Sequence, residues 1–124
     1  MNRNYIIAVF KDDIQDKNFD LTSAREYLNK NGSYFSNQMK LSEEEAKILL
    51  MGKSIEIIND INFSMIDLFE DEIIYDNNLI KECVINLHKY CKEIKKNKEK
   101  GLVLSLIELL ESAEKRNKNV YFLW

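Results

Sequence analysis

One histidine and two cysteines are the residues of this chain best suited to metal binding or nucleophilic chemistry. His88 lies five residues after Cys83 and three before Cys91. A structural zinc site usually takes four protein ligands, and the sequence offers no second cysteine or histidine pair to complete one. A catalytic cysteine needs an adjacent base and a lowered thiol pKa, yet neither cysteine lies in a glycine-rich loop or at a helix start. We therefore expect no metal, no cofactor and no catalytic residue.

Carboxylates are concentrated in one stretch of the chain. Between Lys53 and Lys81 there are seven acidic residues and no basic one. Paired carboxylates can hydrolyse glycosidic bonds, but no spacing singles out a pair here. An enzyme with carboxylate chemistry is therefore the weakest of three functional hypotheses. The stretch instead suggests a surface for a cationic partner, and the candidate partner-binding residues are Asp67, Glu70, Asp71, Glu72 and Asp76.

The spacing of Ser64 and Asp67 is that of a capping box, which predicts a helix over residues 64–72. Asp67, Glu70 and Asp71 would share its exposed face and form an acidic ridge. The alternative is an ordinary solvated surface, because Asp67 also suits a cap and early acids suit the helix dipole. Whether residues 56–76 form one exposed face is left open by the sequence.

A lysine cluster follows the acidic stretch and raises the question of nucleic-acid binding. It contains no arginine, and the whole protein is acidic, with a pI near 5.3. Both features oppose duplex binding. Lysines late in a helix complement the negative end of its dipole, which is the simpler interpretation. The cluster comprises Lys89, Lys92, Lys95, Lys96, Lys98 and Lys100.

The cysteines and the apolar runs indicate a cellular compartment. Cys83 and Cys91 fall in one predicted helix, about 12 Å apart along its axis, so they cannot form a disulfide. The start of the chain lacks the features of a secretory signal, and residues 102–110 are too short and too polar to cross a membrane. We expect a cytoplasmic protein with no membrane contact.

Apolar periodicity and capping signals predict the helices. Capping-box spacings begin helices at residues 23–31 and 42–51, and apolar residues recur with helical spacing over 78–97 and 102–116. The last two helices are expected to form an antiparallel hairpin. The three isolated glycines, Gly32, Gly52 and Gly101, are expected to lie at helix C-termini, where positive φ is common. Residues 55–61 fit a helix or a strand equally well.

Short aromatic and β-branched runs at residues 5–10 and 120–124 predict two buried strands. Residues 33–36 and 72–75 are further strand candidates. The expected fold is a single α+β domain over residues 1–124, in which a small sheet pairs the first and last strands and packs against about four to five helices.

In size, acidity and absence of a catalytic motif the chain resembles immunity proteins of bacterial toxin systems, including those of contact-dependent growth inhibition. The resemblance implies a basic toxin domain as partner, with nucleases the commonest case, and inhibition by covering its active site. Complementary charge would speed such an association. The alternative function is a self-associating structural or regulatory module without catalytic activity. The oligomeric state is not indicated by the sequence.

Overall fold

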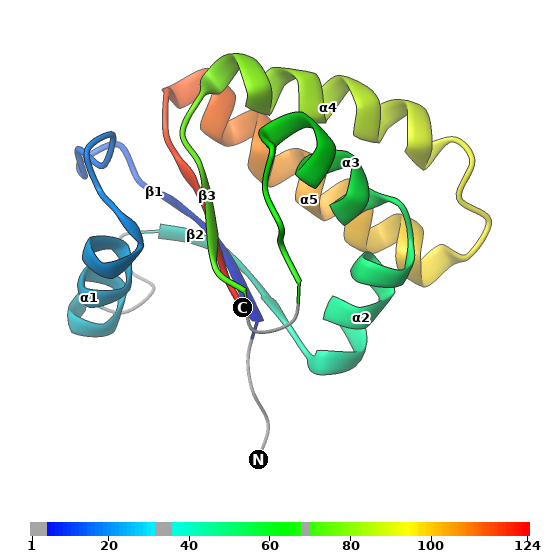
Figure 1. The fold of residues 1–124 in the computed structure, drawn as a ribbon, viewed down its shortest axis with the longest axis horizontal. Coiled ribbons are helices and arrows are strands. Elements are labelled where there is room, and N and C mark those ends of the chain that lie inside the picture. Colours follow the sequence, from blue (N-terminus) through cyan, green and yellow to red (C-terminus); the bar gives the residue numbers. More distant parts are fainter. Residues whose placement is uncertain (1–4, 32–35, 68–69) are drawn as a thin grey trace.

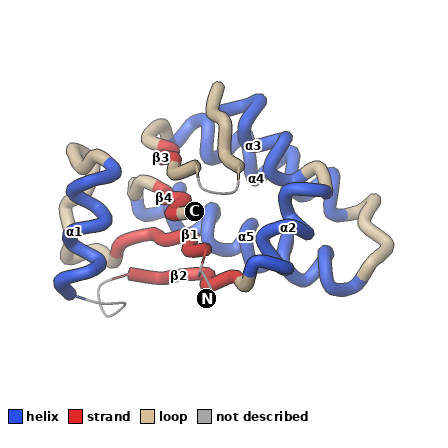
Figure 2. The backbone as a smooth tube through the Cα atoms, turned by 60° about the horizontal axis from the view of Figure 1, so that its bottom comes forward, coloured by secondary structure: helices blue, strands red, loops and turns tan. Residues whose placement is uncertain are grey.

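The fold is built around an antiparallel sheet. A computed structural model of the chain describes residues 5–31, 36–67 and 70–124. Within these residues the sheet has four strands in the order β2-β1-β4-β3, which lie side by side in Figure 2. The two central strands pair through Ile6 with Leu123, Ile7 with Phe122 and Ala8 with Tyr121, which confirms the predicted pairing of the first and last strands. The strands are β1 (Tyr5–Phe10), β2 (Ser36–Leu41), β3 (Glu72–Ile74) and β4 (Val120–Leu123).

Helices cover both faces of the sheet. Helix α1 (Leu21–Asn31) lies on one face, and the other helices lie on the opposite face (Figure 1). Alternate residues of a strand point to opposite faces, so Ile7 packs in the larger core while Ala8 packs in the smaller core beside α1. Because helices cover both faces of the sheet, the central strands are apolar at every position and do not alternate with polar residues.

Four helices form the layer over the larger core. They are α2 (Glu43–Met51), α3 (Ser54–Asn62), α4 (Asn77–Cys91) and α5 (Asn97–Arg116). The Ser42 capping box predicted for α2 is confirmed, because the Ser42 side chain accepts the Glu45 N–H and the Glu45 carboxylate accepts the Ser42 N–H. The capping box predicted at Ser23 is wrong. Helix α1 begins at Leu21, and the Asp20 side chain accepts the Ser23 N–H. The ambiguous residues 55–61 are helical and belong to α3.

The helix predicted over residues 64–72 is wrong. Phe63 adopts the left-handed region, with φ of 52°, and ends α3. The Ser64 hydroxyl donates to the Asn59 side chain at 3.0 Å instead of capping a following turn. Asp67 and Glu70 form an antiparallel bridge, and the chain then enters β3. The competing hydrogen bonds to Asn59 remove the cap that the sequence spacing suggested.

The predicted hairpin of α4 and α5 is confirmed, but its turn is shifted. Helix α4 ends at Cys91 and α5 begins at Asn97. Lys98 and Lys100 therefore lie in the first turn of α5, at the positive end of its dipole, and the late-helix interpretation is wrong for them. Gly52 does follow α2, with φ of −79°, whereas Gly101 lies inside α5. Gly32 lies outside the described residues.

Of the further strand candidates, residues 72–75 are confirmed by β3, whereas residues 33–35 lie outside the described part and only Ser36 belongs to β2. Trp124 is buried against Tyr5, with ring centroids 5.6 Å apart. Cys83 and Cys91 are buried and free. In the described ranges no helix is both long and apolar enough to traverse a bilayer.

Candidate functional site

The acidic stretch forms the connection between α3 and α4, and we call residues 60–76 the acidic segment. In Figure 1 the chain leaves α3, runs beside β3 to the grey residues and returns as β3. The Glu70 N–H donates to the Asp67 carbonyl at 3.0 Å, so this part of the segment turns back on itself. The Asn62 side chain donates to the Ile73 carbonyl at 3.3 Å and ties the end of α3 to β3. The segment is thus anchored at its start and along β3.

Asn59 of α3 organises the start of the acidic segment. Its side-chain oxygen accepts the Ile66 N–H at 2.8 Å, and its amide nitrogen donates to the Ile66 carbonyl at 3.1 Å. Its backbone carbonyl accepts the N–H of Phe63 and, at 3.0 Å, that of Ser64. Ile66 itself is buried in the larger core. One asparagine and one isoleucine therefore hold residues 63–66 in a single conformation.

Two large apolar side chains point away from this anchored turn. Phe63 is 92% exposed and Met65 is 81% exposed. A bulky residue at positive φ is uncommon, and such strain costs about 1–3 kcal/mol where the surrounding structure imposes it. The fold thus presents an aromatic ring to solvent at an unfavourable backbone position. Strained, exposed positions of this kind cluster at functional sites.

The five predicted acidic residues share this segment but have different environments. Asp67 and Glu70 are exposed, as is Asp60 in the last turn of α3. Asp71 is half-buried, forms an ion pair with Arg25 at 2.6 Å and accepts the Trp124 N–H at 2.8 Å.

Glu72 and Asp76 also make contacts within the protein. The half-buried Glu72 accepts the Ile73 N–H at 3.2 Å. Asp76 is the N-cap of α4 and accepts the Asn78 N–H at 2.8 Å. Asp71, Glu72 and Asp76 therefore make hydrogen bonds within the fold, and of these three only Asp76 is exposed, as Asp67 and Glu70 are.

Sequence reasoning missed Asp60, Phe63 and Met65 as site residues. Asp60 was counted in the acidic stretch but falls before the predicted helix. The apolar residues carry no sequence signal of exposure, because an isolated phenylalanine or methionine is more often buried. Only the hydrogen bonds of Asn59, which depend on where α3 ends, turn their side chains outward.

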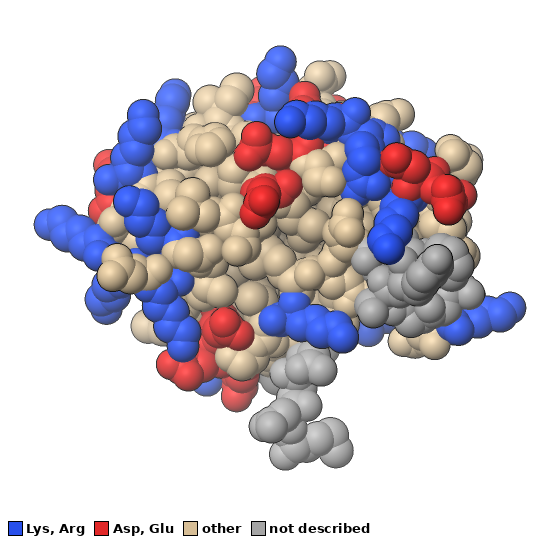
Figure 3. Space-filling view, turned by 180° about the vertical axis from the view of Figure 1, so that it is seen from behind, with Lys and Arg blue, Asp and Glu red and all other residues tan. Residues whose placement is uncertain are grey.

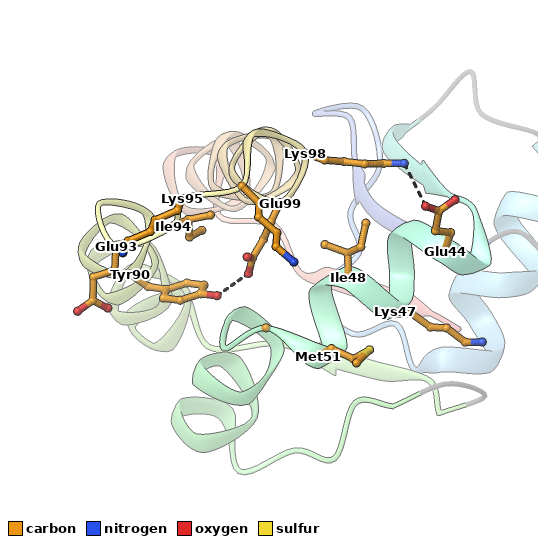
Figure 4. A pocket seen from close by; sticks show the side chains of 12 residues that line it. Glu44, Lys47, Ile48, Met51, Tyr90, Glu93, Ile94, Lys95, Lys98 and Glu99 are labelled. Atoms are coloured by element: carbon orange, nitrogen blue, oxygen red, sulfur yellow. Dashed lines mark hydrogen bonds and ion pairs between the residues drawn. The ribbon is translucent and has the colours of Figure 1, made fainter.

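A second region with functional potential is the groove between α2, the end of α4 and the start of α5, which we call the lysine groove. Its volume is about 800 Å³. Figure 4 shows Ile48 of α2 pointing toward the start of α5 and Tyr90 of α4 pointing toward Glu99. The lining residues are Glu44, Lys47, Ile48, Met51, Gly52, Tyr90, Glu93, Ile94, Lys95, Lys96, Lys98 and Glu99.

A hydrogen bond between Tyr90 and Glu99 closes the base of the lysine groove. The Tyr90 hydroxyl donates to the Glu99 carboxylate and accepts the Lys53 N–H at 3.1 Å. Burial, and then the Glu99 carboxylate, raise the pKa of Tyr90 above its usual value. A Cβ placed on Gly52 would lie 2.2 Å from a carboxylate oxygen of Glu99, so a larger residue here would displace the end of that side chain from its hydrogen bond with Tyr90.

A third polar cluster is buried where the 11–20 loop meets β4. Tyr121 donates to the Asp16 carboxylate at 2.7 Å, and Asn119 donates to the Asp16 carbonyl at 2.9 Å. The Lys118 ammonium donates to the Ile14 carbonyl. Burial, and then the hydrogen bond to Asp16, raise the pKa of Tyr121. These contacts hold the loop against the sheet.

Throughout the described ranges, no group of three or more His, Cys, Asp or Glu side chains is arranged to hold a metal ion. His88 lies 3.8 Å from Glu111 on the surface of the α4–α5 pair. On the face drawn in Figure 3, basic side chains occupy the periphery with acidic ones between them, so what is described of that face carries charge of both signs.

No protein-family model matches this chain, and neither does any curated protein or any solved structure. Function is therefore inferred from the residues of this chain and their arrangement.

Proposed function

We propose that this protein is a binding inhibitor of a basic protein domain, acting as an immunity protein acts on a toxin, and that it docks through the acidic segment. The single observation that carries the proposal is the 92% exposure of Phe63 at a strained, hydrogen-bonded position. Aromatic side chains dominate the binding energy of many interfaces. Because hydrogen bonds already hold the backbone around Phe63, that backbone loses little conformational entropy when the ring enters a partner's pocket.

The surrounding acids support a cationic partner. Asp60, Asp67 and Glu70 are all exposed on the segment that carries Phe63 and Met65. An apolar anchor with charged neighbours is the usual arrangement of a protein interface. The acids would speed the encounter, whereas the two apolar side chains would slow dissociation. A basic nuclease-like toxin domain fits this division of roles, and inhibition would follow from covering its active site.

We also propose a cytoplasmic location. Cys83 and Cys91 are both free and buried, and a reducing compartment keeps thiols in that state. The partner would then be neutralised inside the producing cell.

The test begins with the immobilised chain and a lysate of its native host, with attention to the product of the adjacent gene. A captured basic protein is then purified, and its affinity and its inhibition at equimolar ratio are measured. Two variants separate the roles: Phe63→Ser with Met65→Ser, and Asp60→Lys with Asp67→Lys and Glu70→Lys. The matched control reverses three exposed acids elsewhere, Asp13, Glu82 and Glu108.

The apolar double variant is expected to weaken binding at least about tenfold, mainly through faster dissociation. The triple reversal is expected to slow association, with a larger effect at low salt than at high salt. The control reversal should change the association rate less. Equal effects of the two triple reversals, or full inhibition by the apolar double variant, would contradict the proposal.

A further inference from the structure

The lysine groove lies apart from the acidic segment and has the dimensions of a small-molecule site. Small-molecule pockets typically enclose about 300–1,000 Å³, and this groove encloses about 800 Å³. Its apolar surface comes from Ile48, Met51 and Ile94, and its polar base from Tyr90 and Glu99. A ligand with an apolar body can therefore bury that body between α2 and the α4–α5 turn.

The charges around the groove favour an anion. Of its three glutamates, Glu44 forms an ion pair with Lys98 at 3.6 Å, whereas Glu99 accepts the hydrogen bond of the neutral Tyr90 hydroxyl and keeps its charge. Lys47 is held loosely by Glu43 of its own helix at 3.9 Å. None of the ion pairs between described residues involves Lys95 or Lys96. Among the lining residues outside the Glu44–Lys98 pair, three lysines (Lys47, Lys95 and Lys96) stand against two carboxylates (Glu93 and Glu99), an excess of one positive charge.

We propose that the lysine groove binds a small organic anion with an apolar body, of the class of medium-chain carboxylates. The body lies against Ile48, Met51 and Ile94, and the carboxylate meets Lys95 and Lys96. Because the groove shares no lining residue with the acidic segment, this site is independent of the proposed inhibitor function and either can fail alone.

The test uses a pair of fluorescent probes that differ in charge. Anilinonaphthalene sulfonate is an anion with an aromatic body, and N-phenylnaphthylamine has nearly the same body without the sulfonate. Both are titrated against the full chain, and decanoate is then added as a competitor. The variants are Lys95→Gln with Lys96→Gln, and Met51→Ser. The matched controls are Lys81→Gln with Lys89→Gln, which lie on α4 outside the groove, and Phe63→Ser with Met65→Ser.

The sulfonate is expected to bind one-to-one and to be displaced by decanoate. The groove lysine variant should weaken sulfonate binding about fivefold, as expected for two exposed charge contacts, and leave the neutral probe unchanged. Met51→Ser should weaken both probes, and the two controls should affect neither.

The proposal would be overturned by absence of sulfonate binding, by an equal loss in the Lys81 and Lys89 control, or by displacement of the probe by anionic vesicles but not by free decanoate. Loss of probe binding in the Phe63 and Met65 control would likewise place the probe on the acidic segment and refute a groove site.

Discussion

The acidic segment and the lysine groove are fixed by opposite ends of the same helix. At the start of α3, the Lys53 N–H bonds to Tyr90 and helps close the groove. Toward its end, Asn59 orders residues 63–66 and turns Phe63 outward. One region is a protruding apolar anchor with acids beside it, and the other is a hollow bordered by lysines. The comparison shows that one short helix positions two surfaces of different shape and charge, so each can be altered separately.

The largest expected difference between the regions concerns their apolar anchors. Ile66→Ala removes a buried side chain from beneath the acidic segment and is expected to lower the free energy of unfolding by about 2–5 kcal/mol. Ile48→Ala in the groove should cost only about 1 kcal/mol, because Ile48 is half-buried. Urea unfolding measures both. Equal losses would mean that the segment is not anchored through Ile66.

A smaller effect is expected at the base of the groove. Gly52→Ala places a methyl group against the carboxylate of Glu99, whose side chain must move away from Tyr90, and is expected to destabilise the fold by about 1 kcal/mol through the lost hydrogen bond. Gly101→Ala is the matched control, since nothing lies within 4 Å of its added Cβ and the residue is helical. This control should instead stabilise the protein by up to about 1 kcal/mol. Thermal unfolding of the two variants would then shift in opposite directions.

Phe63→Gly tests whether the acidic segment stores strain. Glycine tolerates positive φ, so the variant is expected to gain about 0.5–1 kcal/mol of stability although it loses an aromatic ring. Met65→Gly should lose stability, because among the described residues only Phe63 and Asn117 are non-glycine positions with positive φ. A destabilised Phe63→Gly variant in urea unfolding would show that the ring contributes to the fold rather than to a surface.

The smallest predicted effect is a dependence on alkaline pH. The fold raises the pKa of Tyr90 above its usual value near 10, so the protonated hydroxyl is favoured in the folded state. The resulting stability is fully present below about pH 10 and is lost as the pH rises through the folded pKa. Urea unfolding at a series of pH values should show that the free energy of unfolding of Tyr90→Phe falls less steeply above about pH 10 than that of the unmodified chain. The remaining decline reflects the buried Tyr121, whose pKa is also raised.

Much of the fold was predictable because its signals are local. Residues 5–10 and 120–124 are apolar at each position, as central strands covered on both faces must be. The capping box at Ser42 and the apolar spacing of α4 and α5 also identified helices correctly. The turn between α4 and α5 was predicted too late in the sequence, because apolar spacing alone extended the first of the two helices past Cys91.

The site was less predictable because it depends on where α3 ends. Ser64 and Asp67 have the spacing of a cap, but the Asn59 side chain captures Ser64 first. No local pattern relates Asp71 to Trp124, which meet through the sheet. The lysine groove likewise requires α2, α4 and α5 to come together, and the close approach of Glu99 to Gly52 joins residues far apart in the sequence.

The position of β4 in the sheet has a consequence for folding. β1 pairs on one side with β2 and on the other with β4, which follows all five described helices. We expect that the edge of β1 which β4 covers stays open during synthesis until β4 emerges. A sheet completed by such a distant strand is slow to assemble and meanwhile exposes unpaired backbone N–H and C=O groups beside apolar side chains. We therefore expect refolding yields to fall with protein concentration, since chains that collide at this stage can pair with one another through that open edge.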